Sequence, residues 1–295
     1  MRSLLGLLTL ALALPASAQD RTPLPEGVPV VTRAAWGGGP PVAPMIPQTP
    51  SALTIHHSGT PMRPERAPAE TLRALYSFST RRDTLGDGTI KEPWPDIPYH
   101  FYVSPNGAIL EARDVAFEGD TNTRYDLSDQ VLVVVEGNFE VETPTDAQME
   151  SLLALSEALA HQWGFGAASV AGHRDHAPGQ TVCPGDALEA RFDDVRAAVE
   201  RGARHALDGT WSFAHTRGEL VLTVGPDGRV SGMVDGAPVA YGRVDATGDA
   251  LHVAFAAPTD AGLDVAHARL HGGQLEGATL ASDGTLTPWT AVRLD

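Results

Sequence analysis

The sequence predicts two structural units in tandem: an α/β unit with a mixed central β-sheet flanked by helices, followed by a small all-β barrel or sandwich. Strand-like and helix-like patterns alternate over about residues 50–205, which favours a mixed sheet with helices on its faces. Residues 131–135 form a continuous Val and Leu run, typical of a central strand buried on both faces. From Asp208 onward, short strand patterns separated by Gly-containing turns replace the helical patterns.

The α/β unit carries local signals for each of its elements. The apolar run at residues 53–57 predicts a buried strand, and residues 67–78 predict a helix with Pro in its first turn. A Pro-Asn-Gly turn within residues 99–113 predicts a hairpin. The Thr-x-x-Gln pattern that begins at Thr145 predicts a capped helix ending before Gly164. Residues 187–206 predict one further amphipathic helix.

The second unit contains about eight strand patterns, as expected for an up-and-down barrel or a sandwich. Its opening Gly-Thr-Trp at residues 209–211 and its closing Trp289 with Arg293 resemble the lipocalins, which gives no indication of a function. The predicted strands lie at residues 210–214, 219–224, 229–234, 239–244, 251–256, 263–270, 274–280 and 288–294.

Composition limits the possible partners. The chain has 295 residues, 42% of them hydrophobic and 20% charged, which is ordinary for a globular protein. Its formal net charge is −16, and it lacks the clustered Lys and Arg that phosphate binding requires. We therefore expect neither a nucleic acid nor an anionic membrane surface as a partner.

The N-terminus has the pattern of a secretory signal peptide over residues 1–18. Arg2 supplies the positive charge, residues 4–14 the apolar core, and Ala16-Ser-Ala the small-residue cleavage site. The apolar run is shorter than the roughly 20 residues that span a bilayer, so no membrane anchor is expected after cleavage. The protein is thus expected in the periplasm or outside the cell. Residues 19–50 are rich in Pro and Gly and predict an extended arm without packed elements.

The single cysteine, Cys183, lies 183 − 173 = 10 positions after His173, between turn-forming Pro and Gly residues. A loop of this kind can bring the imidazole and the thiolate to one point, and these two groups are common zinc ligands. A catalytic zinc site takes three protein ligands and leaves a fourth position for water. Zinc would also protect an unpaired thiol in an oxidising compartment.

Two upstream positions offer the missing ligand and a neighbouring side chain. The strand at residues 53–57 ends in His56 and His57, and alternation allows only one of them to face the site. The hairpin begins with Tyr99 and His100, which face opposite sides for the same reason. The residues alone do not choose within either pair.

Three separated segments together resemble the zinc-dependent N-acetylmuramoyl-L-alanine amidases of the phage-lysozyme and peptidoglycan-recognition-protein type. They are residues 33–37 (Arg-Ala-Ala-Trp-Gly) with 54–58 (Thr-Ile-His-His-Ser), residues 94–107 with 111–113, and residues 172–175 (Gly-His-Arg-Asp) with 183–186 (Cys-Pro-Gly-Asp). This resemblance covers roughly residues 30–200. It implies an amidase fold over residues 51–207, with residues 208–295 as a separate all-β domain.

Carried over by position, the resemblance implies one zinc ion held by His56, His173 and Cys183, with Tyr99 and Thr181 beside it. Thr181 stands where the phage enzymes have Lys, which leaves the proton donor open. The implied reaction is hydrolysis of the bond between N-acetylmuramic acid and L-alanine in peptidoglycan or muropeptides. A zinc-bound water would attack the carbonyl carbon, and the Tyr99 hydroxyl would position the water or donate to the oxyanion.

Glu136 is a candidate general base, as an acidic residue is in a related amidase subclass. The favoured interpretation, however, is a carboxylate at a solvated strand end. Relatives often have a histidine near the substrate cleft where this chain has residues 118–120 (Glu-Gly-Asp), so contacts there are not carried over.

Two other functions fit the same residues. Cys183 and His173 could form a thiol hydrolase, since a lone cysteine near a histidine is also how a nucleophile looks. The chain could instead bind the cell wall without cutting it, as family members without the cysteine do. The presence of all three ligands favours catalysis.

Overall fold

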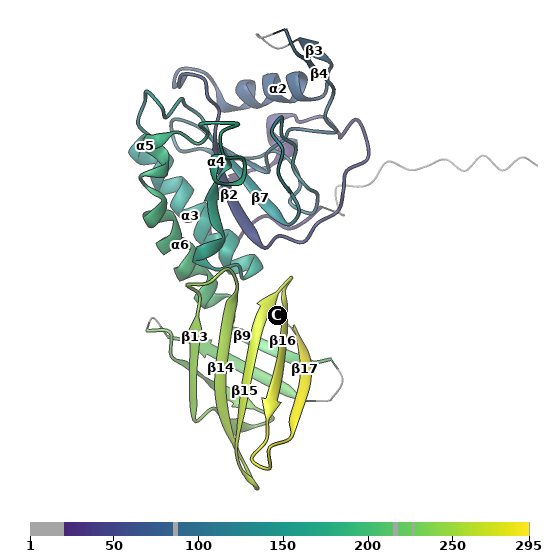
Figure 1. Cartoon of the computed structure of the whole chain (residues 1–295), viewed down its shortest axis with the longest axis vertical. Helices are drawn as coiled ribbons and strands as arrows, with labels where there is room; N and C mark the ends of the chain where they lie inside the picture. The colour runs from purple at the N-terminus through teal and green to yellow at the C-terminus, as the bar shows by residue number, and fades with distance from the viewer. Residues whose placement is uncertain (1–20, 85–87, 215–217, 226, 295) are drawn as a thin grey trace, which may run out of the picture.

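A computed structural model describes residues 21–84, 88–214, 218–225 and 227–294. The predicted signal peptide at residues 1–18 lies outside these residues. Figure 1 shows an α/β unit above a curled β-sheet, with the chain passing from one to the other after helix α6 (Phe192–His205). Within the described ranges, no helix is both long enough and apolar enough to cross a bilayer.

The α/β unit is built on a six-stranded mixed sheet with the order β1-β6-β5-β7-β2-β8. Strand β2 is parallel to β7 and β8, and β7 is parallel to β5, whereas β5 and β6 form an antiparallel hairpin. All six residues of β7 are buried, as expected of its Val and Leu run. The predicted fold class of this unit is confirmed. The strands are β1 (Val30–Val31), β2 (Ala52–His57), β5 (Phe101–Val103), β6 (Ile109–Glu111), β7 (Gln130–Val135) and β8 (Val170–Gly172).

Helix α3 (Asp146–Trp163) begins with the predicted capping box, in which Thr145 and Gln148 exchange side-chain and backbone hydrogen bonds. It lies beside α6, which Figure 1 shows in the same layer. Helix α2 (Pro68–Ser79) also agrees with its prediction. The remaining short elements are α1 (Arg33–Trp36), β3 (Asp83–Thr84), β4 (Ile90–Lys91), the 3-10 turn η2 (Ala167–Ser169), and α4 (His173–His176).

The prediction of a single helix over residues 187–206 is wrong, because this segment forms two helices. Helix α5 (Asp186–Glu189) ends at Ala190, and Arg191 leaves the helical conformation before α6 begins. The Ala187 N–H donates to the Phe139 carbonyl (3.0 Å), which ties α5 to the loop after β7. Helix α6 packs against α3 instead. Two different packing partners therefore interrupt one amphipathic pattern.

The prediction of an arm without packed elements is also wrong over residues 30–38. Strand β1 joins the sheet, and both Arg33 and Trp36 are buried. The Arg33 guanidinium pairs with Asp96 at 2.8 Å, and the Trp36 ring N–H donates to the Glu111 carbonyl at 2.6 Å. Buried polar groups require such partners, and the partners come from distant segments that composition does not reveal.

The second unit is one antiparallel sheet in which each strand pairs with the next along the chain except β12 and β13, which are its two edges. Strand β9 pairs with both β10 and β17, and an isolated bridge joins Arg229, just before β11, to Arg243 of β13. The sheet thus curls as an up-and-down barrel does. Its strands are β9 (Gly209–Phe213), β10 (Glu219–Val224), β11 (Val230–Val234), β12 (Ala237–Pro238), β13 (Tyr241–Asp245), β14 (Leu251–Thr259), β15 (Gly262–His271), β16 (Gln274–Leu280) and β17 (Leu286–Arg293).

The two units contact each other through backbone hydrogen bonds at the segment before β8. The Gly166 N–H donates to the Asp249 carbonyl (3.0 Å), and the Ala167 N–H donates to the Ala246 carbonyl (2.9 Å). A Cβ on Gly166 would lie 2.0 Å from the Gly248 carbonyl oxygen, so this approach requires glycine. One cluster of buried apolar residues runs through both units, and a second cluster around Trp36 and Leu72 lies within the α/β unit alone.

Helices α3 and α6 approach so closely that a Cβ on Gly202 would lie 1.9 Å from the Glu157 carbonyl oxygen. Ala is the better helix former by about 1 kcal/mol, but overpacking costs about 1–3 kcal/mol and more where backbone must move. We expect Gly202→Ala to lower the free energy of unfolding by about 1–3 kcal/mol in urea titrations. The control Gly248→Ala, whose Cβ would meet nothing closer than 3.8 Å, should change it little. A more stable Gly202→Ala protein would contradict this packing.

Candidate metal centre

The end of β2 separates its two histidines by strand alternation. The His56 side chain faces the site, and its ring lies 4.6 Å from that of His173, centroid to centroid. The His57 ring lies on the other face, where Nδ1 accepts from the Phe139 N–H at 3.3 Å. His57 still contributes through its backbone, because its N–H donates to Cys183 Sγ at 3.3 Å.

The second histidine is delivered by β8, whose last residue, Gly172, pairs with Ile55 of β2. His173 follows Gly172 and His56 follows Ile55, so the parallel register of the two strands places these histidines side by side. A Cβ on Gly172 would lie 2.7 Å from the Pro184 ring, so glycine lets the cysteine segment approach. The Arg174 N–H then donates to the Cys183 carbonyl at 2.7 Å, which closes the loop as the sequence predicted.

His56, His173 and Cys183 thus offer one ligand atom each, and these atoms lie within 4.8 Å of one another. Cys183 Sγ is 3.7 Å from His56 Nδ1. The His56 Nε2 atom is buried and has no hydrogen-bond partner among the described residues. Nδ1, which faces the sulfur, is the ring nitrogen placed to bind a metal, and this would leave the buried Nε2 as an N–H donor without a partner among the described residues.

Burial keeps all three groups uncharged. Desolvation, followed by the neighbouring His173, holds the pKa of His56 well below its usual range, and desolvation lowers the pKa of His173 to about 4. Desolvation also raises the pKa of the Cys183 thiol to about 12. Near neutral pH the cluster on its own is therefore a thiol with two neutral imidazoles. A bound cation would favour the thiolate.

Tyr99 connects this cluster to a neighbouring cleft. Its ring lies 5.0 Å from that of His56, and it lines a cavity of about 430 Å³ together with Glu136 and residues of α2. Desolvation raises the pKa of the Tyr99 phenol above its usual value, so the hydroxyl stays protonated and can donate a hydrogen bond. As alternation predicts, Tyr99 and His100 point in opposite directions. The His100 ring is fully buried against the backbone of Leu132 and Phe117.

Glu136 is not at a solvated strand end, so that interpretation is wrong. The residue is 4% exposed, and its carboxylate accepts from the Tyr102 hydroxyl and from the Arg63 N–H, the latter at 2.9 Å. Desolvation raises its pKa. Because it lines the same cavity as Tyr99, it is placed to exchange a proton there.

Thr181 is half-buried and lies two residues before the cysteine in the closing loop. Its Oγ accepts from the Cys183 N–H at 3.1 Å, which leaves its own O–H proton available for donation. Residues 118–120, where relatives often have a histidine, contribute Asp120 to an ion pair with buried Arg113. That pair supports the fold beside the cleft.

Several contacts of the cluster were not predicted from the sequence. His173 Nε2 is within 2.6 Å of the Thr123 hydroxyl oxygen, which fixes the ring orientation. The Tyr125 ring stacks on His176 with centroids 5.2 Å apart and lies 5.3 Å from the His173 ring. These residues belong to a polar loop with no periodic pattern, and no local signal distinguishes them from other loop residues. Their position follows only from the packing of that loop over α4.

This chain is similar to a known protein family over the part that contains the cluster. The family model described as N-acetylmuramoyl-L-alanine amidase matches residues 47–186, which include the whole cluster. Peptidoglycan-recognition protein SD of Drosophila simulans is similar at 28% identity over 174 residues, covering 55% of this chain and 83% of that protein.

Solved structures are also similar to this chain. The structure of Drosophila peptidoglycan recognition protein SD matches at 22% identity with a TM-score of 0.45, covering 56% of this chain and 94% of that one. The N-acetylmuramoyl-L-alanine amidase LysC from Clostridium intestinale URNW matches at 23% identity with a TM-score of 0.40, covering 57% of this chain and 95% of that one.

His100 provides a pH test of the geometry next to the site. The Leu132 N–H donates to its Nδ1 and its Nε2 contacts the Phe117 carbonyl oxygen, both at 2.8 Å, so protonating Nδ1 would break a buried hydrogen bond. Desolvation lowers its pKa to about 4, against about 6.5 when unfolded. Its neutral form therefore stabilises the fold fully above pH ~6.5, and about 3 kcal/mol is lost as the pH falls towards 4. An NMR titration should show the His100 imidazole uncharged at pH 5. A midpoint near 6.5 would contradict the burial described here.

Proposed function

Because residues 47–186 belong to the N-acetylmuramoyl-L-alanine amidase family, we propose that this protein hydrolyses the amide bond between N-acetylmuramic acid and L-alanine in peptidoglycan or muropeptides, using zinc. The observation that carries the proposal is the convergence of His56, His173 and Cys183 within 4.8 Å beside the cleft that Tyr99 lines. The substrate then occupies this cleft, with its scissile carbonyl near the cluster.

One zinc ion per chain fits the donors that the chain presents. His nitrogen and Cys sulfur are both usual zinc ligands, and a catalytic site takes three protein ligands. Ligand atoms on a tetrahedral zinc lie roughly 3.3–3.7 Å apart, given the usual Zn–N and Zn–S lengths. The 3.7 Å separation between Cys183 Sγ and His56 Nδ1 lies within that range. When bound, the metal supplies a nucleophilic water at neutral pH and polarises the carbonyl.

The residues around the cluster then have distinct roles. The Tyr99 hydroxyl, kept protonated by burial, donates to the oxygen that becomes negative as the carbonyl is attacked. Glu136 has a pKa raised by burial and serves as the proton acceptor on the cleft wall. The Thr181 hydroxyl supplies a second neutral donor in place of a charged one. Thr123 orients His173 through its hydrogen bond.

Two further proposals concern location and organisation. Residues 1–18 direct export and are removed, so the protein acts in the periplasm or outside the cell, where its substrate lies. Residues 51–207 form the catalytic unit, and residues 208–295 form a separate all-β domain. The net charge of −16 agrees with a partner that is neither nucleic acid nor anionic membrane.

A second candidate function is recognition of peptidoglycan without cleavage. It is favoured by the similarity to a Drosophila protein named for peptidoglycan recognition. The third candidate, a thiol hydrolase, is favoured by the short distance from Cys183 Sγ to His56 Nδ1. It is opposed by burial, which raises the pKa of the thiol to about 12 and so disfavours the nucleophilic thiolate.

Removing the sulfur should remove the metal. We expect the mature protein to bind one zinc ion per chain and Cys183→Ser to lose it, because a serine hydroxyl is a much poorer zinc ligand. Elemental analysis after gel filtration gives the stoichiometry. The control His205→Gln, at an exposed histidine outside the cluster, should keep its zinc. Undiminished zinc in Cys183→Ser would exclude the proposed ligand set.

Removing the Tyr99 hydroxyl should slow catalysis without releasing zinc. Loss of one oriented donor costs roughly 2–4 kcal/mol in other enzymes, so Tyr99→Phe should lower kcat by about two to three orders of magnitude. The exposed Tyr241→Phe is the matched control. Mass spectrometry of digested peptidoglycan measures cleavage and identifies the bond that is cut.

The same assay separates the three candidates. A zinc amidase releases peptides that begin with L-alanine, stops when a chelator removes the metal, and resists iodoacetamide until then. Binding without any released peptide would favour recognition. Activity that survives prolonged chelation but ends at once with iodoacetamide would establish the thiol hydrolase instead.

A further inference from the structure

The outer face of the barrel has a row of alternating large and small residues that crosses five strands. Arg243 of β13 pairs with Ala254 of β14, which pairs with His267 of β15. The row continues through Ala278 of β16 to Pro288 of β17. Paired residues on neighbouring strands lie side by side on the same face. Each alanine therefore leaves a hollow, one on either side of His267.

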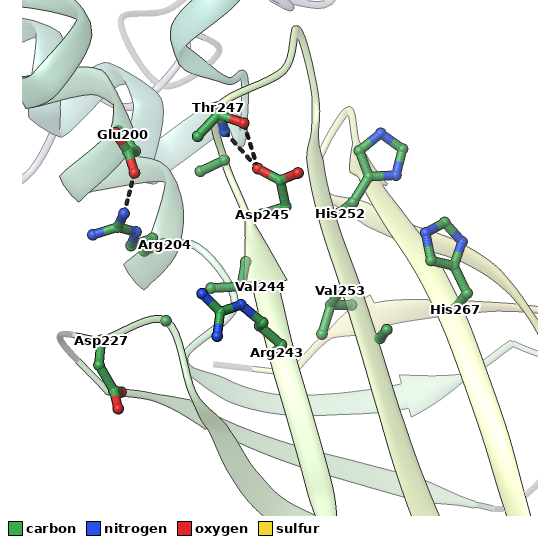
Figure 2. A pocket seen from close by; sticks show the side chains of 13 residues that line it. Glu200, Arg204, Asp227, Arg243, Val244, Asp245, Thr247, His252, Val253 and His267 are labelled. Atoms are coloured by element: carbon green, nitrogen blue, oxygen red, sulfur yellow. Dashed lines mark hydrogen bonds and ion pairs between the residues drawn. The ribbon is translucent and has the colours of Figure 1, made fainter.

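Two cavities occupy these hollows. The first, of about 650 Å³, extends from Arg243, Ala254 and His267 to the last turn of α6 at Arg204. The second, of about 380 Å³, surrounds Ala278. Both are lined by His252 and His267, whose rings stack with centroids 5.4 Å apart. Figure 2 shows the first cavity, with the Arg243 side chain directed towards the space below α6. We call the two cavities together the outer groove.

The carboxylates of the outer groove already have donors. Glu200 accepts from Arg204, which lies one turn later on α6. Asp245 accepts from the backbone N–H of Thr247 at 2.9 Å and from its hydroxyl at 2.6 Å. The carboxylate of Asp227, at the rim, accepts from a backbone N–H at 3.1 Å. Each of these carboxylates thus has one oxygen held by a donor within the protein.

Two of the groove arginines are paired as well, Arg204 with Glu200 and Arg269 with Glu276, whereas Arg243 is not paired with any described residue. The Arg243 guanidinium, with five N–H groups, has no hydrogen bond or ion pair within the described ranges. The His267 ring contacts the His252 ring and no acceptor in the same part of the chain. The groove therefore offers a free planar donor set and two imidazoles to a ligand that accepts. A carboxylate matches this best, because Arg binds it in a bidentate manner.

The far end of the outer groove is apolar. Val265 of β15, Leu280 of β16 and Leu286 of β17 stand in one cross-strand row and line the second cavity. They are 46%, 48% and 66% exposed, an unusual clustering of aliphatic side chains on a barrel surface. A ligand that spans the groove thus combines an anionic group at Arg243 with small apolar groups two to three strand spacings away, roughly 10–15 Å.

We propose that the outer groove binds a short peptide with free carboxylates, placing one carboxylate on Arg243, a second against His267, and aliphatic side chains against Val265 and Leu280. The identification of this peptide as a stem peptide of the cell wall rests on the proposed function. The metal cluster follows the carboxyl end of β8, and the barrel contacts the segment before its amino end. The groove is therefore a second peptide site, separate from the cleft. Two sites on one polymer raise the local concentration of the enzyme on the wall.

The test uses the full mature protein with ¹³C-labelled histidine and the synthetic tetrapeptide L-alanyl-γ-D-glutamyl-L-lysyl-D-alanine. The imidazole signals of His252 and His267 report the groove, and those of His56 and His173 report the cleft. We expect saturable shifts of the groove signals, weakened roughly tenfold or more in Arg243→Gln. Filling the hollow with Ala254→Gln should also weaken them, whereas the exposed control Arg82→Gln should leave them unchanged.

The two sites fail separately in this experiment. Groove signals that stay unchanged at millimolar peptide, or that shift equally in Arg243→Gln and wild type, would overturn the second site whatever the cleft signals do. Equal shifts with a tetrapeptide whose carboxylates are amidated would also overturn it. If the groove responds as expected while the zinc-loaded protein releases no such peptide from muropeptides in a parallel digest, the peptide site stands and the proposed hydrolysis fails.

Discussion

The parallel register between β2 and β8 is the constraint on which the proposed metal centre depends. Ile55 pairs with Gly172, so the residues that follow them, His56 and His173, lie side by side at the end of the two strands. A slip of one residue would present His57 instead and turn His56 to the opposite face. The pairing of all six residues of β2 with the buried strand β7 opposes such a slip, because it would displace apolar side chains from the core.

Backbone hydrogen bonds hold the third proposed ligand, Cys183, beside the two histidines. The Arg174 N–H holds the Cys183 carbonyl, and the His57 N–H donates to the sulfur, so the loop closes over the strand ends. Burial then works against charge on any member of the cluster. A thiolate with two neutral imidazoles has a single negative charge, and a divalent cation compensates it. Desolvation keeps both imidazoles neutral and so ready to bind a metal, whereas the thiol must lose its proton, which only the attraction of a cation would favour at neutral pH.

Much of the fold could be predicted because local sequence patterns specify its individual strands and helices. The Val and Leu run at residues 131–135 and the capping box at Thr145 specify a strand and a helix through periodicity and hydrogen bonding alone. Choosing His56 over His57 required the resemblance to a family, since alternation says only that the two differ. The environment of Glu136 could not be predicted, because Tyr102 and the backbone of Arg63, which enclose it, are distant in sequence. The break between α5 and α6 could not be predicted either, because the two helices contact different segments that are distant in sequence.

If His56, His173 and Cys183 hold one zinc ion, its ligands are one sulfur and two imidazole nitrogens. X-ray absorption at the zinc edge of the metal-loaded mature protein measures this, because sulfur and nitrogen ligands scatter at different distances. We expect one sulfur at about 2.3 Å and two imidazole nitrogens at about 2.0 Å, with an oxygen atom as the fourth ligand. A spectrum without sulfur, or with a single imidazole, would contradict the assignment of His56, His173 and Cys183.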